Sequence, residues 1–156
     1  MRVGLGYDIH PLVTGRRFIL GGVLLPLDKG PKGHSDGDCL NHALTDAILG
    51  ALGLGDIGRH FPDSDPQWKD ADSAVFLKEA RRLLEENKLK VENIDVNLLL
   101  EAPKLVPHMR AMTDNIATLL GISVDRINLK AKRGEGMDAV GRGEAVAAHV
   151  VVLLCP

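Results

Sequence analysis

The sequence predicts an α/β fold of the α+β type: a single domain, residues 1–156, with a mainly four-stranded mixed sheet and helices on one face. Three observations lead to this prediction. Stretches with an apolar residue at every second position are interspersed along the chain with stretches of helical spacing. A chain of 156 residues with 45% hydrophobic content is long enough to bury one core. Residues 145–154 are apolar at nearly every position, which is typical of a strand hidden on both faces.

The expected order of elements is strand, strand, helix, helix, strand, helix, strand, strand. Strands are predicted at residues 3–10, 18–25, 94–100, 126–131 and 144–154. The helices are expected to run from a cap at Ser35 and Asp36 to Gly53, from a cap at Asp72 and Ser73 to about Asn87, and from Pro107 to Gly121. Residues 54–69, rich in Gly, Asp and Pro, are predicted to form a long irregular loop, and loops of this length are usually functional or mobile.

The apolar pattern also predicts self-association. Three helices cover only one face of the sheet, whereas residues 145–154 and 98–100 are apolar without alternation. We therefore expect the sheets of several copies to pack around a common apolar centre. An internal sandwich layer is the alternative, but the chain has no spare elements to form one.

Composition excludes several functions. With 19 Lys and Arg against 21 Asp and Glu, the net charge of −2 provides no basic field for nucleic acid. The longest apolar stretch, residues 145–154, is interrupted by His149. A membrane helix needs about 20 apolar residues, twice the length of this stretch, so no membrane contact is expected. Cys39 and Cys155 are too few for a disulfide scaffold and favour a reduced, cytoplasmic location.

One group of residues has the composition of a metal site. Asp8 and His10 point to the same face of the first strand, and His42 lies beside the apolar stripe of the first helix. One carboxylate and two imidazoles suit a zinc ion with an open fourth position. Asp38 and Asp46 lie four residues either side of His42, where either could accept the second imidazole proton. Taken alone, such a triad is more often coincidental than a metal site.

Two further segments have the residues of a phosphate or cation site. His34 to Asp38 precede the first helix, where Ser35 and backbone N–H groups could hold a phosphate; an ordinary helix cap is the alternative. The segment from Lys130 to Gly136 places three cations beside Glu135, an oxygen donor suited to Mg²⁺. A solvated turn would have a similar sequence.

Five segments, taken together and in order, carry a family resemblance over essentially the whole chain. They are Gly4–His10, His34–Asp38, His42–Ala47, Gly55–Gly58 with Phe61–Asp65, and Gly141–Glu144. In this register they resemble the 2-C-methyl-D-erythritol 2,4-cyclodiphosphate synthase family of the non-mevalonate isoprenoid pathway. Five matching segments are far more specific than any one of them and override the coincidental reading of the triad.

The resemblance implies a lyase that converts 4-diphosphocytidyl-2-C-methyl-D-erythritol 2-phosphate into the cyclic diphosphate and CMP. It implies a homotrimer with active sites between subunits, zinc on Asp8, His10 and His42, Mg²⁺ or Mn²⁺ on Glu135, and no organic cofactor. Phosphate contacts are expected from His34, Ser35, Lys132 and Arg133. The methylerythritol side and lid would comprise Asp56, Ile57, Gly58, Phe61, Pro62, Asp63, Ser64 and Asp65. The cytidine pocket would comprise Leu100, Glu101, Ala102, Pro103, Lys104, Leu105, Val106 and Ala131 of the adjacent subunit.

The chemistry of this reaction agrees with the residue types. The substrate carries its own nucleophile, the 2-phosphate, so the protein must align it, neutralise charge and exclude water rather than supply a Ser, Cys or His nucleophile. The loop at residues 54–69 is the expected lid. A zinc-dependent nucleotide-diphosphate phosphohydrolase and a non-catalytic binder of isoprenoid phosphates are the alternatives.

Two positions leave a choice open. Arg133 stands where the family usually has a threonine, so the phosphate contact there comes either from the Arg133 side chain or from backbone N–H groups. Arg142 and Glu144 precede the strand that should face the oligomer centre. The resemblance suggests that they line a central cavity for an isoprenoid diphosphate, and an ion pair between neighbouring copies is the alternative.

Overall fold

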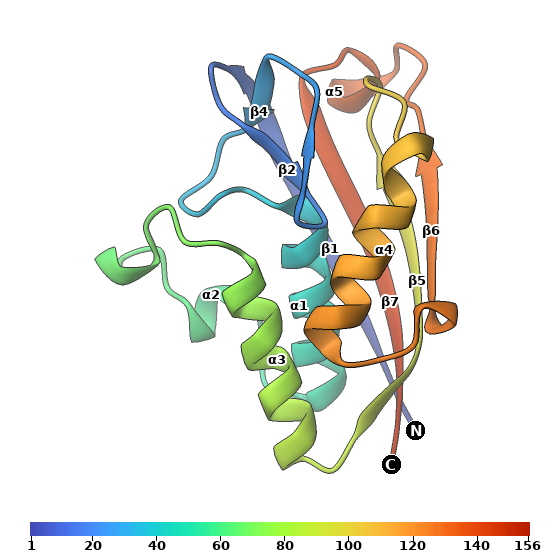
Figure 1. The fold of residues 1–156 in the computed structure, drawn as a ribbon. Helices are drawn as coiled ribbons and strands as arrows, with labels where there is room; N and C mark the ends of the chain where they lie inside the picture. The colour runs from blue at the N-terminus through green and yellow to red at the C-terminus, as the bar shows by residue number, and fades with distance from the viewer.

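The computed structural model describes residues 1–156 as a mixed sheet with three long helices packed on one face (Figure 1). The sheet has five strands in the order β4-β1-β7-β5-β6, and β5 and β6 form its parallel pair. The strands are β1 (Arg2–Thr14), β4 (Lys29–Pro31), β5 (Lys90–Leu99), β6 (Ile127–Lys132) and β7 (Ala145–Cys155). This confirms the predicted fold class, and the short β4 is an addition to the four main strands.

Strand β1 separates its two sets of side chains as a period-2 strand must. It pairs with β7 in antiparallel register along most of its length, from Arg2 opposite Leu154 to Pro11 opposite Ala145. The two termini therefore lie next to each other at one end of the molecule (Figure 1). Gly4 and Gly6 are buried on the helix side, where Asp8 and His10 follow them at the same spacing.

The three long helices are α1 (Cys39–Leu52), α3 (Ala74–Glu86) and α4 (Val106–Leu120). Helix α1 lies on β1 and β7, α4 lies on β6, and α3 packs against α1 and α4. The aliphatic core between the helices and the sheet includes the fully buried Leu44, Ile48, Ile94 and Val150. Both α1 and α4 end at a left-handed glycine, Gly53 and Gly121, as the sequence predicts.

The short elements differ from the prediction. Residues 18–25 are not one strand but a hairpin of β2 (Phe18–Leu20) and β3 (Val23–Leu25). Gly21 and Gly22 form its two-residue turn with positive φ angles of 57° and 74°, a conformation that glycine adopts at little cost. The loop at residues 54–69 contains α2 (Ile57–His60) and a 3-10 turn, η1 (Pro66–Trp68). Two further short elements are η2 (Val124–Arg126) and α5 (Asp138–Gly141).

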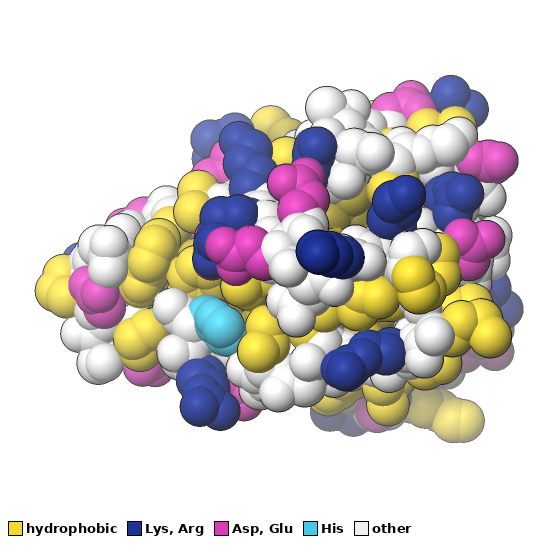
Figure 2. Space-filling view, turned by 90° about the horizontal axis from the view of Figure 1, so that it is seen from below, with side chains coloured by type: hydrophobic (Ala, Val, Ile, Leu, Met, Phe, Trp, Pro, Cys, Tyr) yellow, Lys and Arg dark blue, Asp and Glu magenta, His cyan; other side chains and the backbone are white.

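On the sheet face opposite the helices, the part formed by β1 and β7 is apolar and open, whereas β5 and β6 carry the Asp95–Lys130 ion pair there. Val3 and Leu5 are 68% and 69% exposed, and Tyr7, Ile9 and Val151 are more than two-fifths exposed. Elsewhere the surface mixes charges: at the end of the molecule in Figure 2, acidic and basic side chains lie side by side. None of the helices has the length and apolarity that crossing a bilayer requires.

The close packing of β1 on α1 gives a stability prediction. A Cβ at Gly6 would lie 1.8 Å from the carbonyl oxygen of Ala43, a backbone atom that cannot move without shifting the helix. Overpacking of this kind typically costs about 1–3 kcal/mol, and a clash with backbone should reach at least the upper end. We expect Gly6→Ala to lower the free energy of unfolding by about 3 kcal/mol or more in urea titrations.

Gly50→Ala is the matched control. Gly50 is on α1, the helix that packs on Gly6, and a Cβ at Gly50 would lie 3.9 Å from the carbonyl oxygen of Leu5, an ordinary contact distance. Alanine is about 1 kcal/mol better than glycine inside a helix, so this variant should be as stable as the parent or slightly more so. Equal loss of stability in both variants would contradict the packing explanation.

Candidate metal centre and active site

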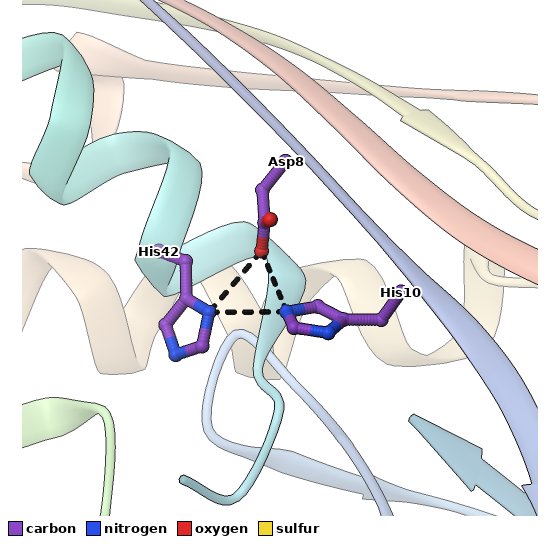
Figure 3. A group of neighbouring side chains, drawn as sticks. All are labelled: Asp8, His10 and His42. Atoms are coloured by element: carbon purple, nitrogen blue, oxygen red, sulfur yellow. Dashed lines mark hydrogen bonds and ion pairs between the residues drawn. The ribbon is translucent and has the colours of Figure 1, made fainter. Parts of the chain in front are cut away.

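Asp8 and His10 on β1 and His42 on α1 point toward one another (Figure 3). The Asp8 Oδ2 atom lies 2.9 Å from His10 Nε2 and 3.1 Å from His42 Nδ1. The two imidazole nitrogens are 3.2 Å apart. Because Gly4 and Gly6 have no side chains, α1 can lie directly on β1, which brings His42 in its first turns up to Asp8 and His10.

The tautomer of His10 follows from the hydrogen-bond partner of Nδ1, the ring nitrogen that faces away from Asp8 and His42. His10 Nδ1 lies 2.9 Å from the carbonyl oxygen of Lys32. A carbonyl only accepts, so we assign the hydrogen to Nδ1. In the neutral ring the lone pair is then on Nε2, which faces Asp8 and His42.

The tautomer of His42 is set in the same way through two hydroxyls. His42 Nε2 lies 2.8 Å from Ser73 Oγ and 3.0 Å from Ser35 Oγ. Ser73 Oγ donates its single proton to Asp36 Oδ1, so it accepts from His42 Nε2–H. The lone pair of His42 is therefore on Nδ1 and points at Asp8.

This donor set fits a small divalent cation. Two imidazole lone pairs and a carboxylate converge, and each outer nitrogen is already hydrogen-bonded, as is usual for metal-binding histidines. Bonds of 2.0–2.1 Å in tetrahedral geometry place ligand atoms about 3.3 Å apart, close to the separations found here. The residues therefore form a group that can hold a metal ion, as the sequence predicts.

Asp8 and His10 shift each other's pKa in opposite directions. Burial raises the pKa of Asp8, but the hydrogen bonds that His10 and His42 donate when protonated, together with their charge, outweigh it and hold the pKa well below its usual range. Burial lowers the pKa of His10, and its hydrogen bond to Asp8 more than reverses this, so the net shift is upward. A metal ion binds the neutral imidazole, so the affinity for metal should fall as the pH falls through that raised pKa.

The expected contacts of Asp38 and Asp46 with His42 are not formed. Asp38 is fully buried as the cap of α1, and its carboxylate accepts from the N–H groups of Gly21, Gly22 and Asn41. Burial raises the pKa of Asp38, against the effect of those donors. Asp46 accepts from the Ile57 N–H at 2.7 Å. Asp38 is the cap of α1 in place of the expected Ser35 or Asp36, and a cap residue turns its side chain back onto the helix end. Asp46 is turned instead toward the N–H at the start of α2.

A cavity of about 360 Å³ opens on the triad. Several predicted site residues line this cavity: His34, Ser35, Ile57, Gly58, Phe61 and Asp63. Asp56 and Asp65 instead cap α2 and η1, and Pro62 and Ser64 are exposed outside the cavity. Trp68 and Phe76 line it without having been predicted. Phe61 packs on both, with ring centroids 5.0 Å from Trp68 and 4.6 Å from Phe76.

Most residues predicted for the cytidine pocket, together with Lys132 and Arg133, line a second cavity of about 250 Å³. Its lining comprises Leu100, Pro103, Lys104, Leu105, Val106, Ala131, Lys132 and Arg133. Ala102 is outside this lining, and Glu101 accepts from the N–H groups of Gly134 and Glu135, each at 3.1 Å. Glu135 is exposed and lines neither cavity. Within one chain, the expected phosphate residues are thus divided between two cavities.

Arg142 and Glu144 form an ion pair inside one chain. The Nε and Nη2 atoms of Arg142 lie 3.0–3.1 Å from the Glu144 carboxylate oxygens. Pairing of these two residues between neighbouring copies stays a prediction.

Fold and site together define an α+β protein with a candidate mononuclear metal centre at a cavity. Residues 1–155 match the model of the YgbB family. The chain belongs to this family.

Relatives that match this chain over nearly their full length are named as synthases. It is 54% identical over 154 residues to the 2-C-methyl-D-erythritol 2,4-cyclodiphosphate synthase of Chloroherpeton thalassium, covering 99% of this chain and 98% of the relative. The synthase of Desulfosudis oleivorans is 56% identical, with coverage of 99% and 92%.

Solved structures agree with these relatives. A 2C-methyl-D-erythritol-2,4-cyclodiphosphate synthase in its CDP-bound form superposes with a TM-score of 0.91 at 47% identity, covering 99% of this chain and 100% of that one. The bifunctional IspDF from Campylobacter jejuni matches with a TM-score of 0.94 at 42% identity, covering 98% of this chain and 42% of the longer one.

The metal centre is tested by removing one ligand. We expect the purified protein to bind one zinc ion per chain. Loss of a residue that only contacts a metal ligand lowers the affinity by up to about 100-fold, so loss of the ligand itself in His42→Ala should lower it by more than that. Competition with a chromophoric chelator measures this. His108→Ala, on α4 and outside the cavity, is the control and should bind zinc like the parent. Unchanged affinity in His42→Ala would contradict the assignment.

Proposed function

We propose that the protein catalyses the reaction of a 2-C-methyl-D-erythritol 2,4-cyclodiphosphate synthase. The substrate is 4-diphosphocytidyl-2-C-methyl-D-erythritol 2-phosphate, and the products are the cyclic diphosphate and CMP. The observation that carries the proposal is the Asp8, His10 and His42 group at a cavity, in a chain at least half identical to named synthases over nearly its full length.

The reaction is an intramolecular phosphoryl transfer. An oxygen of the 2-phosphate forms a bond to the β-phosphorus, and the bond from that phosphorus to the oxygen bridging to the α-phosphate breaks. CMP leaves with the electron pair of that bond, and no water is consumed. The protein must therefore bend one flexible molecule into line and keep solvent away.

Asp8, His10 and His42 would hold zinc, and Glu135 would hold Mg²⁺ or Mn²⁺. Cations bound there supply Lewis-acid stabilisation of the charge on the diphosphate. Glu101 supports the role of Glu135, because it holds the N–H groups of Gly134 and Glu135 and so shapes the loop that presents this carboxylate.

The other cavity residues orient the substrate and exclude water. His34 and Ser35 offer polar groups beside the triad, and Ile57, Gly58 and Asp63 line the part assigned to the methylerythritol unit. The aromatic group of Phe61, Trp68 and Phe76 forms an apolar wall. Such a wall matters because water would compete with the 2-phosphate as nucleophile.

A homotrimer completes the site in this proposal. Two features support it: the open apolar face on β1 and β7, and the division of the phosphate-binding residues between two cavities of one chain. The second cavity would serve as the cytidine pocket for a neighbouring subunit. A central cavity with Arg142 and Glu144 would admit an isoprenoid diphosphate only in competition with their ion pair. Two free thiols, Cys39 and Cys155, support a reduced, cytoplasmic setting.

Isotope incorporation tests the reaction. In ¹⁸O-labelled water, with substrate, zinc and Mg²⁺, we expect release of CMP and a cyclic product without label, because the 2-phosphate is the nucleophile. Mass spectrometry of both products measures this. Label in a linear product would point to a phosphohydrolase, and no CMP release in a single turnover would point to a binding protein; either result contradicts the proposal.

A further inference from the structure

Ser73 stands where a helix cap is expected but does not cap the helix. It directly precedes α3, it is completely buried, and its side chain makes no bond to the first turn. Asp72 takes over that task, because its Oδ1 accepts from the Ala74 N–H at 2.9 Å. The Ser73 hydroxyl is therefore free for another role.

The hydroxyl joins Asp36 to the candidate metal ligand. Ser73 Oγ donates to Asp36 Oδ1 and accepts from His42 Nε2 at 2.8 Å. Each oxygen of Asp36 also accepts a backbone N–H, from Asp38 and from Ser73, both at 3.0 Å. With three donors around it, Asp36 holds Ser73 in the direction that leaves His42 Nδ1 unprotonated.

Further hydrogen bonds fasten the segment at residues 54–72, which includes the loop predicted to be the lid. Its end is joined to the chain before α1 by two backbone bonds, from Asp70 to His34 at 2.8 Å and from Asp36 to Ala71 at 3.1 Å. Its beginning is tied to α1 by the bond from Ile57 N–H to Asp46. Ser73 thus lies where the end of this segment meets His42.

We propose that Ser73 is a positioning residue that couples metal binding at His42 to the order of the segment at residues 54–72. The inference rests on the metal centre of the proposed function and not on the reaction. A bound ion favours the ring orientation in which His42 donates to Ser73, and that contact holds the end of the segment. The coupling is reciprocal: an ordered segment also favours metal binding.

Two readouts other than catalysis test this with zinc as the probe. We expect Ser73→Ala to weaken zinc binding by about 10-fold or more, as loss of an outer partner of a metal-binding histidine usually does. In the parent protein, zinc should slow amide hydrogen exchange in residues 54–72. In Ser73→Ala, at saturating zinc, this protection should be largely lost. Trp68 is the chain's single tryptophan, so its fluorescence reports the same change.

Two further variants sharpen the test. Asp36→Asn keeps the size of the side chain but leaves a single oxygen to accept from two backbone N–H groups. Like Ser73→Ala, it should weaken zinc binding. It carries the test if Ser73→Ala does not fold, as judged by circular dichroism. Ser123→Ala is the matched control, because Ser123 precedes η2 and makes no side-chain bond there. It should behave like the parent.

The possible failures are distinguishable. If the parent binds zinc and Ser73→Ala binds it equally well with unchanged exchange in residues 54–72, the role of Ser73 is overturned and the metal centre stands. If Ser73→Ala loses affinity but zinc still protects the segment, the coupling is overturned. If the parent itself binds no zinc, the metal centre fails, and the inference fails with it.

Discussion

The site depends on how closely α1 lies against β1. Gly4 and Gly6 present only hydrogen atoms to the helix, and a Cβ at either position would come within 1.8 Å of a backbone oxygen of α1. Because of this approach, Asp8 and His10, the next two residues on that face, meet His42 in the first turns of the helix. The glycines therefore act on function through backbone packing, although they carry no chemical group.

Hydrogen bonds around the two imidazoles turn this proximity into a metal site. The Lys32 carbonyl and the Ser73 hydroxyl each hold an outer ring nitrogen, and both inner lone pairs then face Asp8. These partners come from the segment before α1 and the start of α3. The same two regions carry His34 and Ser35 at the cavity and the end of the segment at residues 54–72. Cavity wall and metal ligands therefore share one hydrogen-bond network.

Periodicity was sufficient to predict the main strands, the three long helices and the face shared by Asp8 and His10, because these features depend on local sequence. The hairpin at Gly21 and Gly22 was missed although its signal is local: two glycines between two apolar runs are typical of a two-residue turn. Ser73 could not have been found from spacing: it lies 31 residues from His42 and has the sequence signature of a cap. The partner of a side chain is a tertiary contact, which a local pattern does not contain.

The convergence of Asp8, His10 and His42 on one ion is the central claim. Anomalous diffraction on both sides of the zinc absorption edge, from crystals grown with zinc, tests it most directly. We expect one peak per chain at about 2.0–2.2 Å from Asp8 Oδ2, His10 Nε2 and His42 Nδ1. An ion bound elsewhere, or bound through His10 Nδ1 or His42 Nε2, would contradict it.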